Sequence, residues 1–173
     1  MNKFKKTFRL SLILVAVCSL LFGSALMTAH TSASIGTKHL SADTLQELAR
    51  ARNATAKYHD VARAEADGYV FNACVPGEGR EYINFALVDC TFDIEHPEAL
   101  HYITQGNRLR LVGVEYVVPI ACTATAPEGF AGDADVWEFM GEGLPIWNLR
   151  VALWMHNPDG IFAEDNPRVP NCP

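Results

Sequence analysis

The globular part of this chain lacks two side chains on which much enzyme chemistry depends, because no serine follows Ser41 and no lysine follows Lys57. Serine-based catalytic triads, phosphate-binding loops that end in lysine and Schiff-base lysines therefore have no candidate residue there. The sequence also contains no Cys-x-x-Cys pair, which removes the commonest thiolate pattern of a structural zinc site.

Basic charge is scarce as well. The chain has 14 Lys and Arg against 20 Asp and Glu, and four of the basic residues lie within residues 1–33. Without that segment, 140 residues remain with 10 basic and 20 acidic side chains, a net charge of −10. So acidic a protein repels phosphate backbones and anionic lipid, and we expect no nucleic-acid partner.

The N-terminal segment predicts a secretory signal peptide over residues 1–33. A basic start, Met1–Arg9, precedes an apolar run, Leu10–Leu26, and small or polar residues follow, which is the order of such signals. Small residues place the cleavage after Ala33, with a cut after Ala25 as the alternative. An uncleaved anchor is a further reading, since about 17 apolar residues is near the minimum that spans a bilayer. We favour cleavage, a secreted or extracytoplasmic location and no stable membrane insertion afterwards.

Four cysteines follow the signal: Cys74, Cys90, Cys122 and Cys172. An even number in an oxidising compartment predicts two disulfides, for which three pairings exist. We favour Cys74–Cys90 with Cys122–Cys172, because the first two cysteines flank adjacent predicted strands.

One helix is predicted at the start of the exported chain. Thr44 and Glu47 have the spacing of a helix capping box, and no Gly or Pro occurs from there to Asp67. Apolar and small residues recur at helical spacing, and Gly68 stands where a C-terminal cap belongs. This pattern predicts a single helix of about six turns.

After this helix the chain changes to short β-rich runs joined by turns. These runs are Tyr69–Val75, Tyr82–Val88, Leu100–Ile103, Arg108–Val118 and Ile146–Met155. Five strands after one helix predict an α+β fold, in which the helix packs on an antiparallel sheet within a single domain over residues 34–173.

Two stretches are irregular. Residues 123–145 hold five acidic residues and no basic one, interleaved with Phe130, Trp137 and Phe139. One reading is a solvent-exposed loop whose aromatic residues pack against the edge of the sheet. The other is a lid or a calcium-binding loop, although the ligand spacing of an EF-hand is missing. The tail from His156 has four prolines, so it is an ordered coil or a loose end, and Cys172 favours the ordered coil.

Charged residues in the predicted strands are the candidate site. Alternation puts Glu115 on an apolar face, where a carboxylate must be paired, hydrogen-bonded or in a cavity. Pairing of the two long strands would bring it near Arg150, and Glu81 could join them. The group is a structural ion pair, a ligand pocket or a carboxylate-based catalytic site. The ligand pocket would be built from Glu81, Glu115, Arg150, Trp154 and His156.

The other histidines give no metal pattern. His39 and His59 belong to the lead-in and the helix, and His96 and His101 flank the turn at Pro97 without a usual ligand spacing. His156, between a strand end and a turn, is the most site-like of the five.

Several phrases of the sequence resemble a family of small secreted bacterial proteins that has no settled activity. They are Arg108–Pro119 (RLRLVGVEYVVP), preceded by Pro97–Leu100 and followed by His156–Ala163 (HNPDGIFA) and Asn166-Pro167. The resemblance covers roughly residues 44–172 and implies secretion.

The resemblance also bears on metal. In that family a histidine often stands at the positions of Glu81 and Arg150. If those histidines and a glutamate at Glu115 formed a site in relatives, this chain has replaced two of the three. A guanidinium has no free lone pair and stays protonated, so we expect no tightly held transition metal and no cofactor, and leave weak calcium binding by residues 123–145 open.

The sequence thus favours a secreted, disulfide-stabilised module that binds an extracellular ligand or protein, or associates with the envelope, without catalysis. The alternative is an extracellular metal-dependent or carboxylate-based enzyme. An enzyme would show converging titratable groups with shifted pKa values in a concave site, whereas a binding module would show an apolar groove or flat patch.

Overall fold

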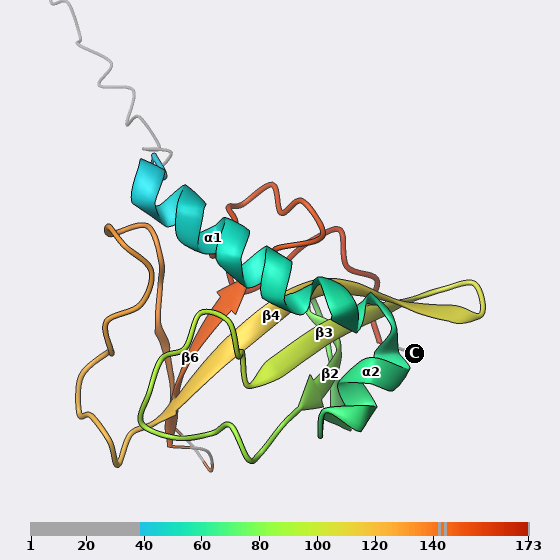
Figure 1. Ribbon diagram of the computed structural model, residues 1–173, viewed down its shortest axis with the longest axis horizontal. Coiled ribbons are helices and arrows are strands. Elements are labelled where there is room, and N and C mark those ends of the chain that lie inside the picture. The colour runs from blue at the N-terminus through green and yellow to red at the C-terminus, as the bar shows by residue number, and fades with distance from the viewer. Residues whose placement is uncertain (1–38, 142, 144, 173) are drawn as a thin grey trace, which may run out of the picture. The chain divides into compact units, whose positions relative to one another are not determined.

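Six antiparallel strands form one curled sheet with the helices on one of its faces (Figure 1). The computed structural model describes residues 39–141, 143 and 145–172, and the predicted signal peptide over residues 1–33 lies outside them. The strands are β1 (Val70–Val75), β2 (Gly79–Ile83), β3 (Ala99–Gln105), β4 (Arg108–Pro119), β5 (Glu138–Met140) and β6 (Ile146–Val151). Their order in the sheet is β1-β2-β3-β4-β6-β5. The α+β prediction is confirmed, whereas the predicted count of five strands is wrong, because β5 forms inside the acidic stretch.

The predicted single helix is divided into three parts, α1 (Ala42–Thr55), the 3₁₀ turn η1 (Ala56–His59) and α2 (Val61–Ala66). The break occurs at Asp60, whose backbone is extended and whose side chain accepts a hydrogen bond from Ala62 N at 3.2 Å. A side chain that caps a new helix competes with continuation of the old one. Gly68 does follow the helical segment with a positive φ of 98°, as the sequence predicted.

The start of α1 also differs from the prediction. Ser41 is the N-cap, and its hydroxyl accepts from Thr44 N at 3.0 Å. Thr44 and Glu47 instead bind the acidic stretch: Thr44 Oγ1 donates to Ala131 O at 2.5 Å, and Glu47 Oε2 accepts from Ala131 N at 2.7 Å. Their spacing therefore serves a tertiary contact rather than a capping box.

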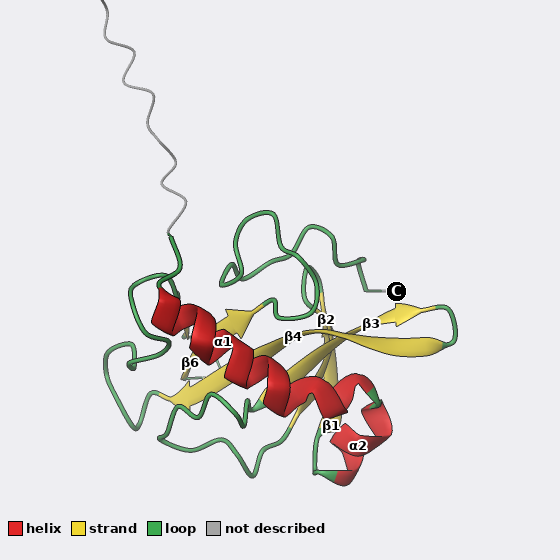
Figure 2. Cartoon of the chain, turned by 45° about the horizontal axis from the view of Figure 1, so that its top comes forward, coloured by secondary structure: helices red, strands yellow, loops and turns green. Residues whose placement is uncertain are grey.

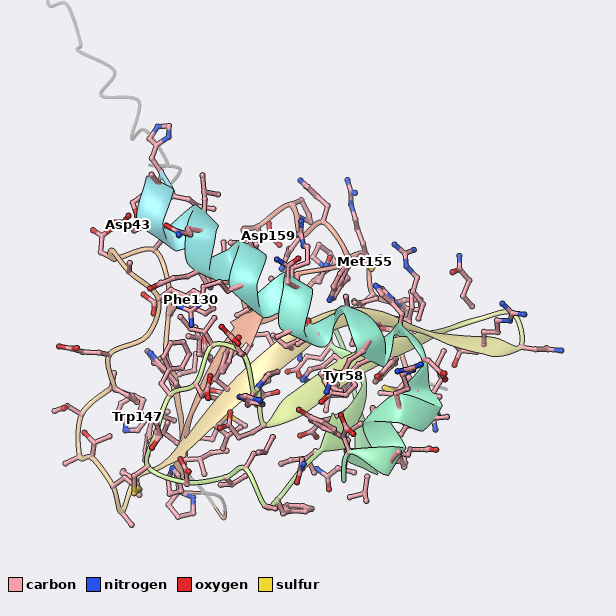
Figure 3. All side chains as sticks on the ribbon, viewed as in Figure 1. Asp43, Tyr58, Phe130, Trp147, Met155 and Asp159 are labelled. Carbon is pink, nitrogen blue, oxygen red and sulfur yellow. A yellow bond between two sulfur atoms is a disulfide. The ribbon has the colours of Figure 1, made fainter. Side chains whose placement is uncertain are left out.

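Figure 2 shows α1 lying across the strands of the sheet, and the hydrophobic core includes residues of both. Aromatic rings dominate it: Tyr102 is fully buried and meets Tyr82 edge-on, with 5.2 Å between ring centroids. Tyr58 lies beneath the end of α1, and Phe130, from the acidic stretch, lies beside its first half (Figure 3). The aliphatic members from the sheet are Leu100, Leu111, Val114, Leu149 and Val151.

Two strands end earlier than their sequence predicts. β2 ends at Ile83 because the next residue, Asn84, turns the chain: its side chain accepts from Ala86 N and donates to Asp67 O. β6 ends at Val151, after which Trp154 N and Met155 N both donate to Val112 O.

Both disulfides exist, but the favoured pairing is wrong, because the bonds are Cys74–Cys172 and Cys90–Cys122. The coil between β2 and β3 runs to the far end of β4, where Ile94 O accepts from Tyr116 Oη at 2.8 Å, and this path brings Cys90 to Cys122. The C-terminal tail returns instead to the β1–β2 turn and Cys74.

The tail from His156 is an ordered coil (red in Figure 1). Asn157 and Asn166 are buried, and their amide groups bind backbone oxygens: Asn157 Nδ2 donates to Asp165 O at 2.9 Å, and Asn166 Nδ2 donates to His156 O at 3.3 Å. Among the described residues, no helix is long and apolar enough to cross a membrane.

Candidate functional site

The sheet face turned away from α1 carries a row of charged side chains. In the strand register Glu81 lies opposite His101, His101 opposite Gly113, and Glu115 opposite Arg150. Directly paired residues share a face, as do alternate residues along a strand. The predicted proximity of Glu115 and Arg150 is therefore confirmed, and the structure adds His101 between the strands of Glu81 and Glu115.

His101 and Glu115 form a buried hydrogen bond. The distance from His101 Nε2 to Glu115 Oε2 is 2.7 Å, and the imidazole is fully buried. Gly113, the β4 residue that faces His101, has no side chain.

Arg150 joins this pair to Glu78. Its Nη1 contacts Glu78 Oε2 and lies 2.9 Å from His101 Nδ1, while its Nη2 donates to Glu78 O at 3.3 Å. Nη1 also lies 3.1 Å from His101 Nε2, so it stands over the ring rather than on the in-plane lone pair of Nδ1. A neutral His101 protonated on Nε2 donates to Glu115. We call Glu78, His101, Glu115 and Arg150 the buried network.

Burial shifts the proton equilibria of this network. It raises the pKa of Glu78 to about 7 even though Arg150 lowers it, and it raises the pKa of Glu115. Burial, with the nearby Arg150 charge, holds the pKa of His101 well below its usual range. His101 is therefore neutral near pH 7, and its 3.6 Å approach to Glu78 is not an ion pair.

The β1–β2 turn and the C-terminal coil hold Glu78 in place. Gly77 and Gly79 flank it with φ values of 78° and 98°, which side chains other than glycine rarely adopt. A Cβ on Gly79 would lie 2.5 Å from Tyr102 O. Asn166 N donates to Gly77 O at 2.9 Å, so the coil covers the turn that carries Glu78.

A second group of polar side chains lies beside the network. Asn148, on the same face of β6 as Arg150, donates from Nδ2 to Glu164 Oε1 at 3.3 Å. Burial and the Glu78 charge raise the pKa of Glu164 to about 7. Arg150, Glu164, Asn157 and Asn166 line one small pocket under the coil.

The remaining predicted residues lie outside the network. Glu81 is half-buried, and its carboxylate accepts from Asn72 Nδ2 at 2.9 Å on β1. Trp154 packs against η1 and α1: the His59 ring of η1 meets it edge-on with 4.4 Å between centroids, and the Arg52 guanidinium of α1 lies 5.5 Å from its ring centroid. His156 is exposed. The five predicted residues therefore do not form one pocket; only Glu115 and Arg150 come together.

Two residues of the network were missed in the sequence. His101 was treated as flanking a turn, although it lies inside β3, where alternation from Ala99 places it on the face of Glu115. Nothing in the sequence around Glu78 indicates that it is buried, because a glutamate next to Pro76-Gly77 is typical of a solvent-exposed turn.

Chemically, the network is a buried set of two carboxyl groups, one neutral imidazole and one guanidinium. Glu78, His101 and Glu115 also offer carboxylate and imidazole ligand atoms that all lie within 4.8 Å of one another, the residue types that bind divalent transition metals. Arg150 supplies the positive charge that this set requires.

Comparison of the chain with protein-family models, with curated proteins and with solved structures finds no match.

Proposed function

We propose that the protein is an extracytoplasmic, non-catalytic binding module that captures an extended, basic segment of a partner protein along the free edge of β5. Two disulfides support an oxidising compartment, as does the resemblance to secreted bacterial proteins. The burial of the network, in which Arg150 contacts Glu78, supports a structural rather than a catalytic role for the charged residues beneath the coil.

The observation that carries the proposal is the composition of the β5 edge. Among the described residues no further strand pairs with β5, which ends the sheet. Phe139 and Met140 on this strand are 51% and 45% exposed, and Val136 just before it is 45% exposed. An uncovered strand with apolar side chains is a template for an added strand, because its backbone groups on that edge lack partners.

Charge indicates the chemistry of the partner. Residues 123–141 include four acidic side chains and no basic one, and Glu138 lies within β5 itself, exposed. Neighbouring positive charge on the incoming segment would speed its encounter and fix its orientation. A neutral or acidic segment would lack that attraction.

The test uses an alternating Lys-Val octapeptide with blocked ends and, as its counterpart, a Glu-Val octapeptide. Trp147 faces Phe139 in the register, with 5.4 Å between the rings, so its fluorescence reports on the edge. We expect salt-sensitive binding of the basic peptide alone, and at least about tenfold weaker binding by Phe139→Ser, which removes the apolar ring without adding charge.

The matched control is Phe85→Ser, since Phe85 is 63% exposed but lies outside the sheet. This variant should bind the basic peptide as the unaltered protein does. Equal binding of both peptides, equal losses in both variants, or no binding at all would contradict the proposal.

The alternative of a carboxylate-based enzyme has one observation in its favour, the pKa of about 7 for both Glu78 and Glu164. A group titrating near neutrality suits proton transfer. Arg150 and the coil, however, occupy the space in front of Glu78, and a substrate would first have to displace them.

A further inference from the structure

The buried network has the ligand set of a metal centre built from three separate elements. Glu78 comes from the β1–β2 turn, His101 from β3 and Glu115 from β4. His101 Nδ1 and Glu78 Oε2 are 3.6 Å apart, close to the roughly 3.4 Å between two ligands of a tetrahedral ion with bonds of about 2.0–2.1 Å. All three residues are buried, so the site is shaped by the fold rather than by flexible surface side chains.

A cation already interacts with the same atoms. Arg150 Nη1 contacts Glu78 Oε2 and lies 2.9 Å from His101 Nδ1 and 3.1 Å from His101 Nε2, so it stands against two residues of the ligand set. A guanidinium cannot be a ligand, because it keeps its protons and has no lone pair to give. It therefore competes with a metal ion for this position.

A second observation shows that the guanidinium satisfies the site incompletely. Within the described chain, Asn148 Oδ1 and Arg150 Nε are buried without a hydrogen-bond partner. Asn148 is 3% exposed and lies two residues from Arg150 on the same face of β6. A buried amide oxygen without a donor is costly, and it is also a type of atom that divalent cations accept as a ligand.

The pocket beside the network does not relieve this competition. Its volume is about 10 Å³, room for about one water molecule and not for a guanidinium. We propose that Glu78, His101 and Glu115 bind a divalent transition-metal ion such as Zn²⁺, and that the Arg150 guanidinium competes with the ion for this position.

The test is calorimetric titration with ZnCl₂ of the unaltered protein, Arg150→Gln, and Arg150→Gln combined with His101→Gln. We expect weak binding by the unaltered protein, one ion bound at least about tenfold more tightly by Arg150→Gln, and loss of that gain when His101 is also replaced. Arg80→Gln is the matched control, since Arg80 is a half-buried arginine of the neighbouring strand β2 that lies over the Phe71 ring. It should leave zinc affinity unchanged.

Exposed side chains are a competing source of zinc binding. His96 and Asp93 form an exposed pair at 2.9 Å, so His96→Gln is made in each background and should not remove the tight site. Affinity that does not rise in Arg150→Gln, or that survives His101→Gln, would overturn the proposal.

If Arg150→Gln does not fold, the comparison uses the unaltered protein against His101→Gln. Zinc should then raise the Tm of the first and not of the second, because a ligand stabilises only the state that binds it. An equal response of the two proteins would also overturn the proposal.

Discussion

Glu98 provides a test of how burial sets the stability of this fold. It is 2% exposed, and its Oε2 accepts from Val117 N at 2.9 Å. Burial raises its pKa from 4.5 to about 8. Between these values the unfolded chain releases the proton and the folded protein keeps it. The free energy of unfolding must therefore fall as pH rises from about 4.5 to about 8 and level off above that range.

The perturbation is Glu98→Gln, which keeps an acceptor oxygen for Val117 N and removes the titration. The pKa difference sets an upper bound of about 5 kcal/mol on the pH-dependent loss, and the buried amide nitrogen costs about 1 kcal/mol at every pH. The variant should then be about 1 kcal/mol less stable than the unaltered protein at pH 4.5 and about 2–4 kcal/mol more stable at pH 9.

Urea melts at half-unit pH intervals measure both curves. Glu78 and Glu164 titrate near pH 7 in both proteins, so the difference between the curves isolates Glu98. Parallel curves would refute the reasoning, because they would mean that Glu98 is ionised in the folded protein at no cost.

Three further predictions concern the network, the disulfides and export. Arg150→Met should destabilise the fold by about 3–5 kcal/mol by leaving Glu78 buried and unpaired, whereas Arg80→Met should cost about 1 kcal/mol or less in the same urea melt. Replacing Cys74 and Cys172 by Ala, which opens a separation of 98 residues, should cost about 4.7 kcal/mol against about 3.7 for Cys90 and Cys122 with a separation of 32; equal losses would contradict the loop-entropy account. Peptide mapping without reduction should recover the same two pairs and no free thiol. N-terminal sequencing of exported protein should begin at Ser34, and a start at Leu26 would favour the alternative cleavage site.

The strand pairing at the centre of the sheet could be predicted because long strands carry a clear signal. In β4 and β6 apolar and polar residues alternate over many positions, so the face of Glu115 and its proximity to Arg150 follow from the sequence. A short strand has too few positions for apolar and polar residues to show such an alternation. β5 has three residues, all exposed, and its sequence does not distinguish it from the loop around it.

The missed partners of Arg150 depend on contacts between distant parts of the chain. Glu78 looks like a solvated turn residue until Asn166, almost ninety positions later, binds Gly77 O and brings the coil over the turn. The same return of the tail decides the disulfide pairing, since it places Cys172 beside Cys74 rather than Cys122. Neither periodicity nor local propensity contains this information.

The two faces of the sheet explain why a coil, and not a second helix, covers the network. A helix satisfies its own backbone groups and presents side chains only, so it suits the aromatic and aliphatic face beneath α1. The opposite face carries Glu78, Asn148 and Arg150, which need donors and acceptors at irregular positions. The coil supplies an acceptor for Asn148 through Glu164, and its Asn166 N donates to Gly77 O in the turn that carries Glu78. It gains less from apolar burial than a packed helix would, and the Cys74–Cys172 bond holds its end against the sheet by limiting the freedom of the unfolded chain.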